Sequence, residues 1–125
     1  AIMMGLAQPL SAEDMADLDA WYASQTIAPR SIGKDQLALA SEGESLYRGG
    51  SAELAIPACM ACHGPAGRGM PSNYPRVAGQ WPEYLESQLL AFKSGERAGK
   101  IMGPIAHRLS AQQIHALSVY MSALQ

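Results

Sequence analysis

The chain has 125 residues, of which 48% are apolar, 16% are charged and 6% are aromatic. This length suits one ordinary domain, or one domain with a fragment of another, and the apolar share excludes wholesale disorder. A formal charge of −2 excludes a strongly basic nucleic-acid binder. No apolar run approaches the roughly 20 residues of a membrane span. The two cysteines, at positions 59 and 62, are too few and too close in sequence to stabilise a small secreted fold through disulfide bonds.

The N-terminal residues do not have the features of a signal peptide. Residues 1–10 lack a basic region, and their apolar stretch breaks at Gln8-Pro9. Ser11 is a good N-cap, and it predicts a helix with an apolar stripe at Met15, Leu18 and Trp21-Tyr22. Residues 26–34, which contain Pro29 and Gly33, predict a linker.

The rest of the chain also favours helices over strands. Asp35 predicts the start of a helix that ends at Gly49-Gly50, and residues 58–63 predict one or two helical turns. Residues 64–79 hold four Gly and three Pro and predict a long irregular loop. Pro82 and Gly95 bound another helix, residues 97–104 predict a loop, and Ser110 opens a final helix with Gln113 completing its capping box. We therefore expect an all-α fold.

An internal repeat relates the two ends of the chain. Residues 2–24 align with residues 101–123, and seven of the 23 aligned positions are identical. Chance would give roughly one or two identities. The match includes an Ile-Met pair that precedes each Ser cap, which two unrelated capped helices would not share. We expect residues 1–25 to be the end of an upstream copy of the domain formed by residues 35–125.

Cys59-Met60-Ala61-Cys62-His63 is a C-x-x-C-H motif, the pattern of c-type haem attachment. On a helical turn, positions i, i+3 and i+4 share one face, so both thiols can form thioethers with one haem while the imidazole binds the iron. A dithiol oxidoreductase would need a βαβ scaffold, which the sequence does not predict. A zinc site would need two more ligands.

The sixth iron ligand has several candidates among the methionines and histidines. Met102 lies 39 residues beyond His63, in a predicted loop, which lets the chain approach the haem from the opposite side. His107 is the alternative. The remaining candidates are less suited: Met60 lies inside the attachment turn, Met70 lies in the Gly/Pro loop, Met121 lies on a packing stripe, and His115 lies on a polar face.

Residues 35–125 resemble a class I cytochrome c domain. The pairing with a second domain, the helix end Tyr47-Arg48-Gly49-Gly50 and the stretch Tyr74-Pro75-Arg76-Val77-Ala78-Gly79-Gln80 resemble the dihaem cytochrome c4 family. The match continues through Tyr84-Leu85, Gln88-Leu89 and Phe92-Lys93-Ser94-Gly95-Glu96-Arg97. The resemblance implies a class I fold whose helices wrap around one covalent haem c.

The resemblance also implies roles for individual residues. Cys59 and Cys62 attach the haem, His63 and Met102 bind the iron, and a loop proline carbonyl, from Pro75 or else Pro71, accepts the His63 Nδ1–H. The haem propionates would be bound by Arg76, Gln80, Tyr84 and Gln88. Gly43 would let the first helix of the domain cross the last one closely against Tyr120. Met3 or Met4 corresponds to the axial methionine of an upstream domain whose Cys-Cys-His is not in this sequence, so we expect one haem in this chain.

The function implied by the resemblance is electron transfer in the bacterial periplasm or at its membrane face, without enzymatic activity. The implied partners are a quinol-oxidising complex as donor and a terminal oxidase as acceptor, and peripheral membrane association stays open. Residues 1–25 are expected to pack on another chain, on a missing upstream haem domain, or on the intact domain of residues 35–125. A cytochrome domain or subunit of a larger dehydrogenase or reductase is the first alternative. A haem sensor with a labile sixth ligand is the second, and a thiol-redox enzyme is a distant third.

Overall fold

The computed structural model describes residues 2–28 and 30–125. Ala1 and Pro29, which belong to the predicted upstream remnant and the predicted linker, lie outside the described residues. The helices that it contains are α1 (Ile2–Ala7), α2 (Ala12–Ala23), the short 3₁₀ helix η1 (Lys34–Gln36), α3 (Leu37–Gly49), α4 (Met60–His63), α5 (Pro82–Ser94), α6 (Met102–Arg108) and α7 (Ala111–Ala123). The described residues form only isolated β-bridges and no strand, so the all-α expectation is confirmed.

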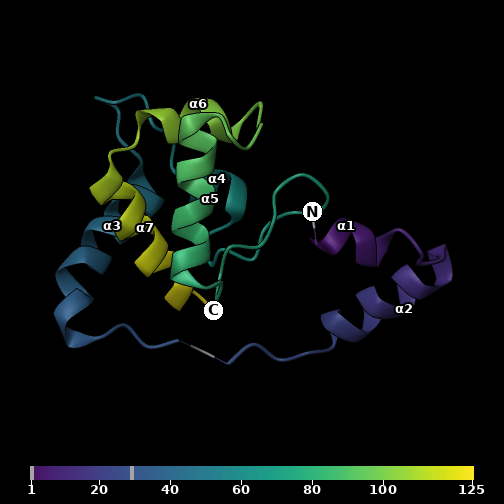
Figure 1. The fold of residues 1–125 in the computed structure, drawn as a ribbon. Coiled ribbons are helices and arrows are strands. Elements are labelled where there is room, and N and C mark those ends of the chain that lie inside the picture. Colours follow the sequence, from purple (N-terminus) through teal and green to yellow (C-terminus); the bar gives the residue numbers. More distant parts are fainter. Residues whose placement is uncertain (1, 29) are drawn as a thin grey trace.

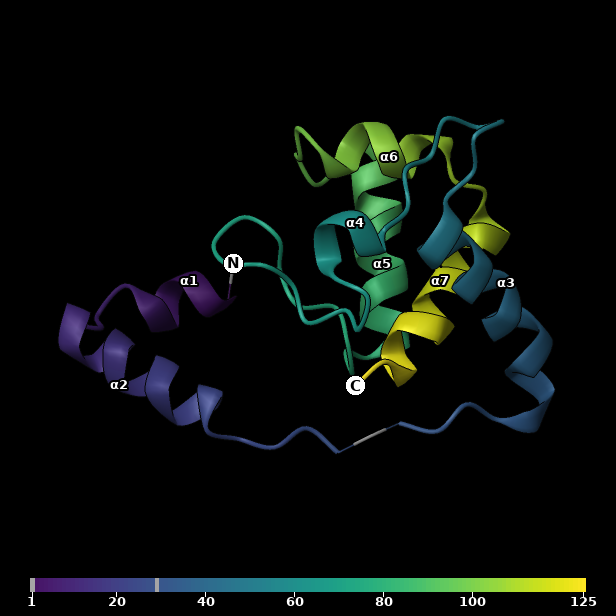
Figure 2. The same cartoon turned by 180° about the vertical axis from the view of Figure 1, so that it is seen from behind.

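Helices α3 to α7 pack into one group, and α1 and α2 lie apart from it at the end of an extended segment (Figures 1 and 2). The core of this group is formed where α3 and α5 pack against α7. Its fully buried side chains include Tyr47, Leu109, Ile114 and Leu117. Among the described residues, no helix has the length and apolar character needed to cross a membrane.

The predicted close crossing of α3 and α7 occurs at Gly43. A Cβ atom at this position would collide with the carbonyl oxygen of Ala116 and would lie 2.9 Å from Cβ of Tyr120. Backbone atoms of α7 cannot rotate away as a side chain can, so only glycine allows this approach. The crossing brings the rings of Tyr47 and Tyr120 together, with their centroids 5.5 Å apart.

The Ser-capped helices at both ends are confirmed, and both have a capping box in the structure. Ser11 and Asp14 bond reciprocally at the start of α2, and Ser110 and Gln113 do the same at the start of α7. Each capped helix follows a short helix, α1 or α6, so the repeated sequences have the same local structure. Their environments differ, because α7 is largely buried whereas every described residue from Met3 to Ala28 except Leu10 is exposed. The division into 1–25, 26–34 and 35–125 stays a prediction.

Two expected boundaries are different in the structure. Asp35 does not cap α3 but lies within η1, and α3 begins after Gln36, which caps it without a side-chain hydrogen bond. The predicted loop over residues 97–104 ends early, because α6 begins at Met102 and includes Gly103 and Pro104. Proline is compatible with the first turn of a helix, where its missing N–H has no intrahelical acceptor.

Candidate haem-attachment site

The two cysteines and His63 lie on one short helical turn. Cys59 has helical backbone angles, the N–H of Cys62 and the N–H of His63 both donate to the Cys59 carbonyl, at 3.2 and 2.9 Å, and Gly64 ends the turn with a positive φ of 82°. Positions i, i+3 and i+4 of such a turn share one face. The geometry that C-x-x-C-H chemistry requires is therefore present in the backbone itself.

The imidazole of His63 is buried and held in one orientation. Its side chain is 8% exposed, and Nδ1 lies 2.8 Å from the carbonyl oxygen of Pro75. A carbonyl oxygen can only accept a hydrogen bond, so Nδ1 carries a proton, and in the neutral imidazole Nε2 is then the nitrogen with the free lone pair. Pro75, rather than Pro71, is the loop proline at this position. Such a hydrogen bond fixes both the tautomer and the ring plane of a metal-binding histidine.

Tyr47 supports the same turn from α3, a role that the sequence did not predict. Its side chain is fully buried, and its hydroxyl donates to the carbonyl of Gly64 at 2.7 Å. Burial raises the pKa of Tyr47 to about 12, so the phenol stays a neutral donor. On the other side, the N–H of Gly69 donates to the carbonyl of His63 at 2.8 Å. The carbonyls of His63 and Gly64 are thus fixed by two separate segments.

The chemistry of the two thiols does not suit the thiol-redox alternative. Burial raises the pKa of the Cys59 thiol to about 11, and the neighbouring Cys62 adds to the effect. Redox-active dithiols have a thiol pKa lowered below its ordinary value, because the thiolate is the reacting species. The cysteines are not joined to each other. Within the described residues, no group of three or more His, Cys, Asp or Glu side chains is placed to hold a metal ion, which is also unlike a zinc site.

Met102 is the first residue of α6, is partly buried and packs against the hydrophobic core. The other sulfur candidates are placed differently. Met121 is 5% exposed and belongs to the core, Met70 is 42% exposed in the loop, and Met60 packs against the core from within the attachment turn. His107 is exposed on α6, and His115 is exposed on α7, where it pairs with Glu86 at 2.9 Å.

The side chains expected at the propionates have local partners in the structure. Nε of Arg76 donates to the carbonyl of Ala78 at 3.1 Å, and Oε1 of Gln80 accepts from the N–H of Trp81 at 2.8 Å. Oε1 of Gln88 accepts from Arg97 at 2.6 Å, and Tyr84 is 49% exposed. Their assignment to propionates stays a prediction.

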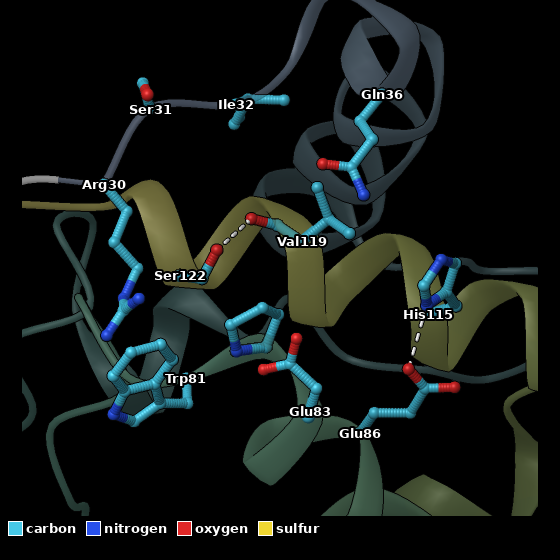
Figure 3. Close-up of a pocket in the computed structure, with 11 residues that line it drawn as sticks. Arg30, Ser31, Ile32, Gln36, Trp81, Glu83, Glu86, His115, Val119 and Ser122 are labelled. Carbon is cyan, nitrogen blue, oxygen red and sulfur yellow. Dashed lines mark hydrogen bonds and ion pairs between the residues drawn. The ribbon is translucent and has the colours of Figure 1, made fainter.

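A separate pocket of about 440 Å³ lies between residues 30–36 and helices α5 and α7 (Figure 3). None of the cysteines, His63 or Met102 lines it. The guanidinium of Arg30 lies 3.5 Å from the centroid of the Trp81 ring, and its Nε donates to the carbonyl of Gly79 at 3.4 Å. These contacts attach the predicted linker to the start of α5.

The residues present fit a covalent c-type haem. Two thiols and an oriented imidazole share one helical face, and a thioether that could serve as a second axial ligand belongs to the same domain. Among the hydrogen bonds of the described residues, His63 uses Nδ1 and leaves Nε2 available as a ligand. A donor set of this kind is typical of haem iron rather than of zinc or calcium.

Comparisons with known proteins also identify the chain as similar to c-type cytochromes. The family model described as cytochrome c matches residues 40–125. Cytochrome c4 of Thiocapsa roseopersicina is 41% identical over 98% of this chain and 65% of its own length. A thiosulfate dehydrogenase electron acceptor of Thiomonas intermedia is 36% identical over 98% of this chain. The crystal structure of reduced recombinant cytochrome c4 from Pseudomonas stutzeri has a TM-score of 0.87 and 37% identity, over 98% of this chain and 66% of that one.

The chain spans 58% to 65% of the length of these and similar curated relatives. The cytochrome c match and the spacing of Cys59 and Cys62 show that it carries one covalent haem c with iron. The predicted class I fold is confirmed by the same comparisons. The chain belongs to the cytochrome c family and, within it, to the cytochromes c4.

Proposed function

We propose that this chain is a periplasmic electron carrier whose iron is bound by His63 and Met102 and which passes electrons toward a terminal oxidase. That it is a c-type cytochrome electron carrier follows from its family and relatives. The observation that best supports binding of the iron by His63 is the 2.8 Å contact between Nδ1 of His63 and the Pro75 carbonyl. It leaves Nε2, on the face of the two thiols, as the only ring nitrogen able to bind a metal.

The ligand pair explains why the chain would transfer electrons rather than activate oxygen. A c-type haem supplies reversible one-electron chemistry, and His/Met ligation raises its potential and fills both axial positions. The protein's part is to hold His63 and Met102 in place. Pro75 and Tyr47 fix the His63 side, and core packing fixes the Met102 side. The proposal assigns no substrate turnover to the chain.

The cellular setting and partners are part of the same proposal. Covalent haem attachment to a C-x-x-C-H motif takes place in the bacterial periplasm, so we place the chain there or at the periplasmic face of the membrane. A quinol-oxidising complex would be the donor. Redox partners form small transient interfaces, which suits a carrier that meets two partners in turn.

An intact mass together with a visible spectrum tests the proposal. We expect a mass gain of one haem, sharp low-spin bands on reduction, and no spectral change with carbon monoxide, because both axial positions are filled. Replacing Cys59 or Cys62 by Ala should leave one thioether and shift the pyridine haemochrome spectrum. Carbon monoxide binding to the native reduced protein would contradict the His/Met pair and favour a haem sensor.

A second candidate function follows from relatives with a different name. Two curated relatives, from Thiomonas intermedia and Stutzerimonas stutzeri, are called thiosulfate dehydrogenase electron acceptors. The chain would then serve as the electron-accepting partner of a dehydrogenase. Mixing the oxidised protein with a thiosulfate dehydrogenase and thiosulfate tests this alternative. Rapid reduction of the protein would favour this alternative. The alternative would be excluded if the dehydrogenase failed to reduce the protein while a quinol-oxidising complex reduced it rapidly.

A further inference from the structure

The predicted linker, residues 26–34, contacts the haem-binding domain where the loop after the attachment turn leads into α5. Nε of Arg30 donates to the carbonyl of Gly79 at 3.4 Å, and the guanidinium lies 3.5 Å from the centroid of the Trp81 ring (Figure 3). Ile27 makes a second contact, because a Cβ atom at Gly79 would lie 3.1 Å from Cγ2 of Ile27. Two side chains of the linker therefore meet at one glycine of the domain.

The backbone of Gly79 connects the linker with α7. Its φ of 73° lies in the left-handed region, which favours glycine. The N–H of Gly79 donates to the carbonyl of Met121 at 3.3 Å, while the carbonyl of Gly79 accepts from Arg30. Both polar groups of this peptide position are therefore used, one toward the core and one toward the linker.

The segment that ends at Gly79 also carries the carbonyl that holds His63. Pro75, whose carbonyl lies 2.8 Å from Nδ1 of His63, precedes Gly79 by four residues. The N–H groups of two intervening residues donate to the carbonyl of Gly67, at 2.8 and 2.9 Å. The short stretch between Pro75 and Gly79 is thus held along its length, so the position of one end affects the position of the other.

The loop is closely packed on the side of Pro75 as well. A Cβ atom at Gly69 would lie 2.7 Å from the carbonyl carbon of Pro75, and the N–H of Gly69 donates to the carbonyl of His63 at 2.8 Å. The ring of Tyr74 packs edge-on against the His63 ring, with the centroids 6.5 Å apart. In a packing this close, a shift at one point of the segment is transmitted to its neighbours, including the contact at Nδ1.

We propose that Arg30 is a positioning residue for the axial histidine. By fixing Gly79 it holds the Pro75 carbonyl at the distance that Nδ1 of His63 requires, and it thereby helps to set the reduction potential. This inference rests on the proposed electron-transfer function. Arg30 does not touch the imidazole itself and acts through the segment that ends at Gly79.

The hydrogen bond and the charge of Arg30 have opposite effects on the reduction potential. A partner that accepts the Nδ1–H of a metal-binding histidine makes the imidazole more basic, which favours the more highly charged Fe(III). Loosening the contact with Pro75 therefore favours the reduced protein. Loss of a nearby positive charge favours the oxidised protein, because that form carries one more positive charge. The sign of the change separates positioning from simple electrostatics.

Three variants of the haem-loaded protein test the inference. Arg30→Met removes both the hydrogen bond and the stacking on Trp81. Lys34→Met is the matched control, because it removes one positive charge from an exposed position of the same linker. Arg30→Lys keeps the charge but lacks the planar guanidinium that stacks on the ring while donating through Nε.

Two readouts are measured for each variant. The first is the solvent-exchange rate of the His63 Nδ1 proton, followed by NMR in the reduced protein, which reports the hydrogen bond itself and not electron transfer. The second is the redox equilibrium with a reference couple. The visible spectrum checks that the haem site of each variant is intact.

We expect Arg30→Met to speed exchange of the Nδ1 proton about tenfold, because opening of this hydrogen bond no longer works against the linker contact. The redox equilibrium should shift about twofold or more toward the reduced form. Arg30→Lys should change both quantities in the same directions. Lys34→Met should change the exchange rate by less than about twofold and should not favour the reduced form.

An unchanged exchange rate in Arg30→Met would overturn the inference, because loss of the linker contact would then not reach Pro75. Equal shifts toward the oxidised form in Arg30→Met and Lys34→Met would also overturn it, since charge alone would explain them. Either result would leave the electron-transfer function standing if the reduced wild-type protein is low-spin and inert to carbon monoxide. Carbon monoxide binding by the wild-type protein would instead contradict the proposed function.

Discussion

Replacing Gly43 by Ala should destabilise the protein although alanine is the better helix former. The new Cβ would collide with the Ala116 carbonyl oxygen and lie 2.6 Å from the Ala116 carbonyl carbon. Relieving this requires α3 and α7 to move apart, and overpacking of this kind costs up to about 3 kcal/mol. The gain in helix propensity returns about 1 kcal/mol. We expect the free energy of unfolding to fall by about 2 kcal/mol.

Gly49→Ala is the matched control, because Gly49 lies in the same helix and a Cβ there would meet nothing within 4 Å. Only the propensity change remains at that position, so this variant should be unchanged or more stable by up to about 1 kcal/mol. Urea titrations followed by circular dichroism measure both variants. A Gly43→Ala protein as stable as the wild type would show that the two helices do not need this close contact.

Two further substitutions test contacts around the site. Tyr47→Phe should lower the free energy of unfolding by about 1–2 kcal/mol, because the Gly64 carbonyl loses its donor, whereas Tyr22→Phe at an exposed position on α2 should have little effect. Folding raises the Tyr47 pKa from 10.0 to about 12, so the free energy of unfolding of the wild-type protein should fall as pH rises across this range. An equally steep fall in Tyr47→Phe would show that Tyr47 is not the cause of this pH dependence. Arg30→Met should speed thermolysin cleavage within residues 26–34, since the guanidinium no longer holds Trp81 and Gly79. Cleavage no faster than in Lys34→Met would contradict this attachment.

Local sequence signals predicted most of the helices. Ser11 and Ser110 mark α2 and α7 because a hydroxyl cap and its partner three residues later act within one turn. Gly64 and Gly95 mark helix ends because their positive φ values, both 82°, favour glycine. The start of α6 was missed because Gly103 and Pro104 usually interrupt helices, although both are tolerated in a first turn.

The site was predictable where its chemistry is local in sequence. The spacing of Cys59, Cys62 and His63 is sufficient to define the attachment face, and the family resemblance pointed to Pro75. The bond from Tyr47 to Gly64 spans 17 positions, and no local pattern announces it. Helix periodicity indicates only that Tyr47, four residues after Gly43, lies on the buried face of α3, and it does not identify the carbonyl that the hydroxyl contacts.

The side chains expected at the propionates stay a prediction, which rests on the family resemblance. In the structure Gln88 bonds with Arg97, and Arg76 bonds with the carbonyl of Ala78. A polar side chain near a site has many candidate partners, and sequence alone does not rank them.

The far-red absorption spectrum of the oxidised protein tests the central claim most directly, because a charge-transfer band in that region reports a thioether bound to ferric haem. The account predicts the band in the wild-type protein and its loss in Met102→Ala, together with a lower reduction potential. Met70→Ala is the control and should keep the band, since Met70 is exposed in the loop. Survival of the band in Met102→Ala, or its loss in Met70→Ala, would contradict the assignment of His63 and Met102 as the ligand pair.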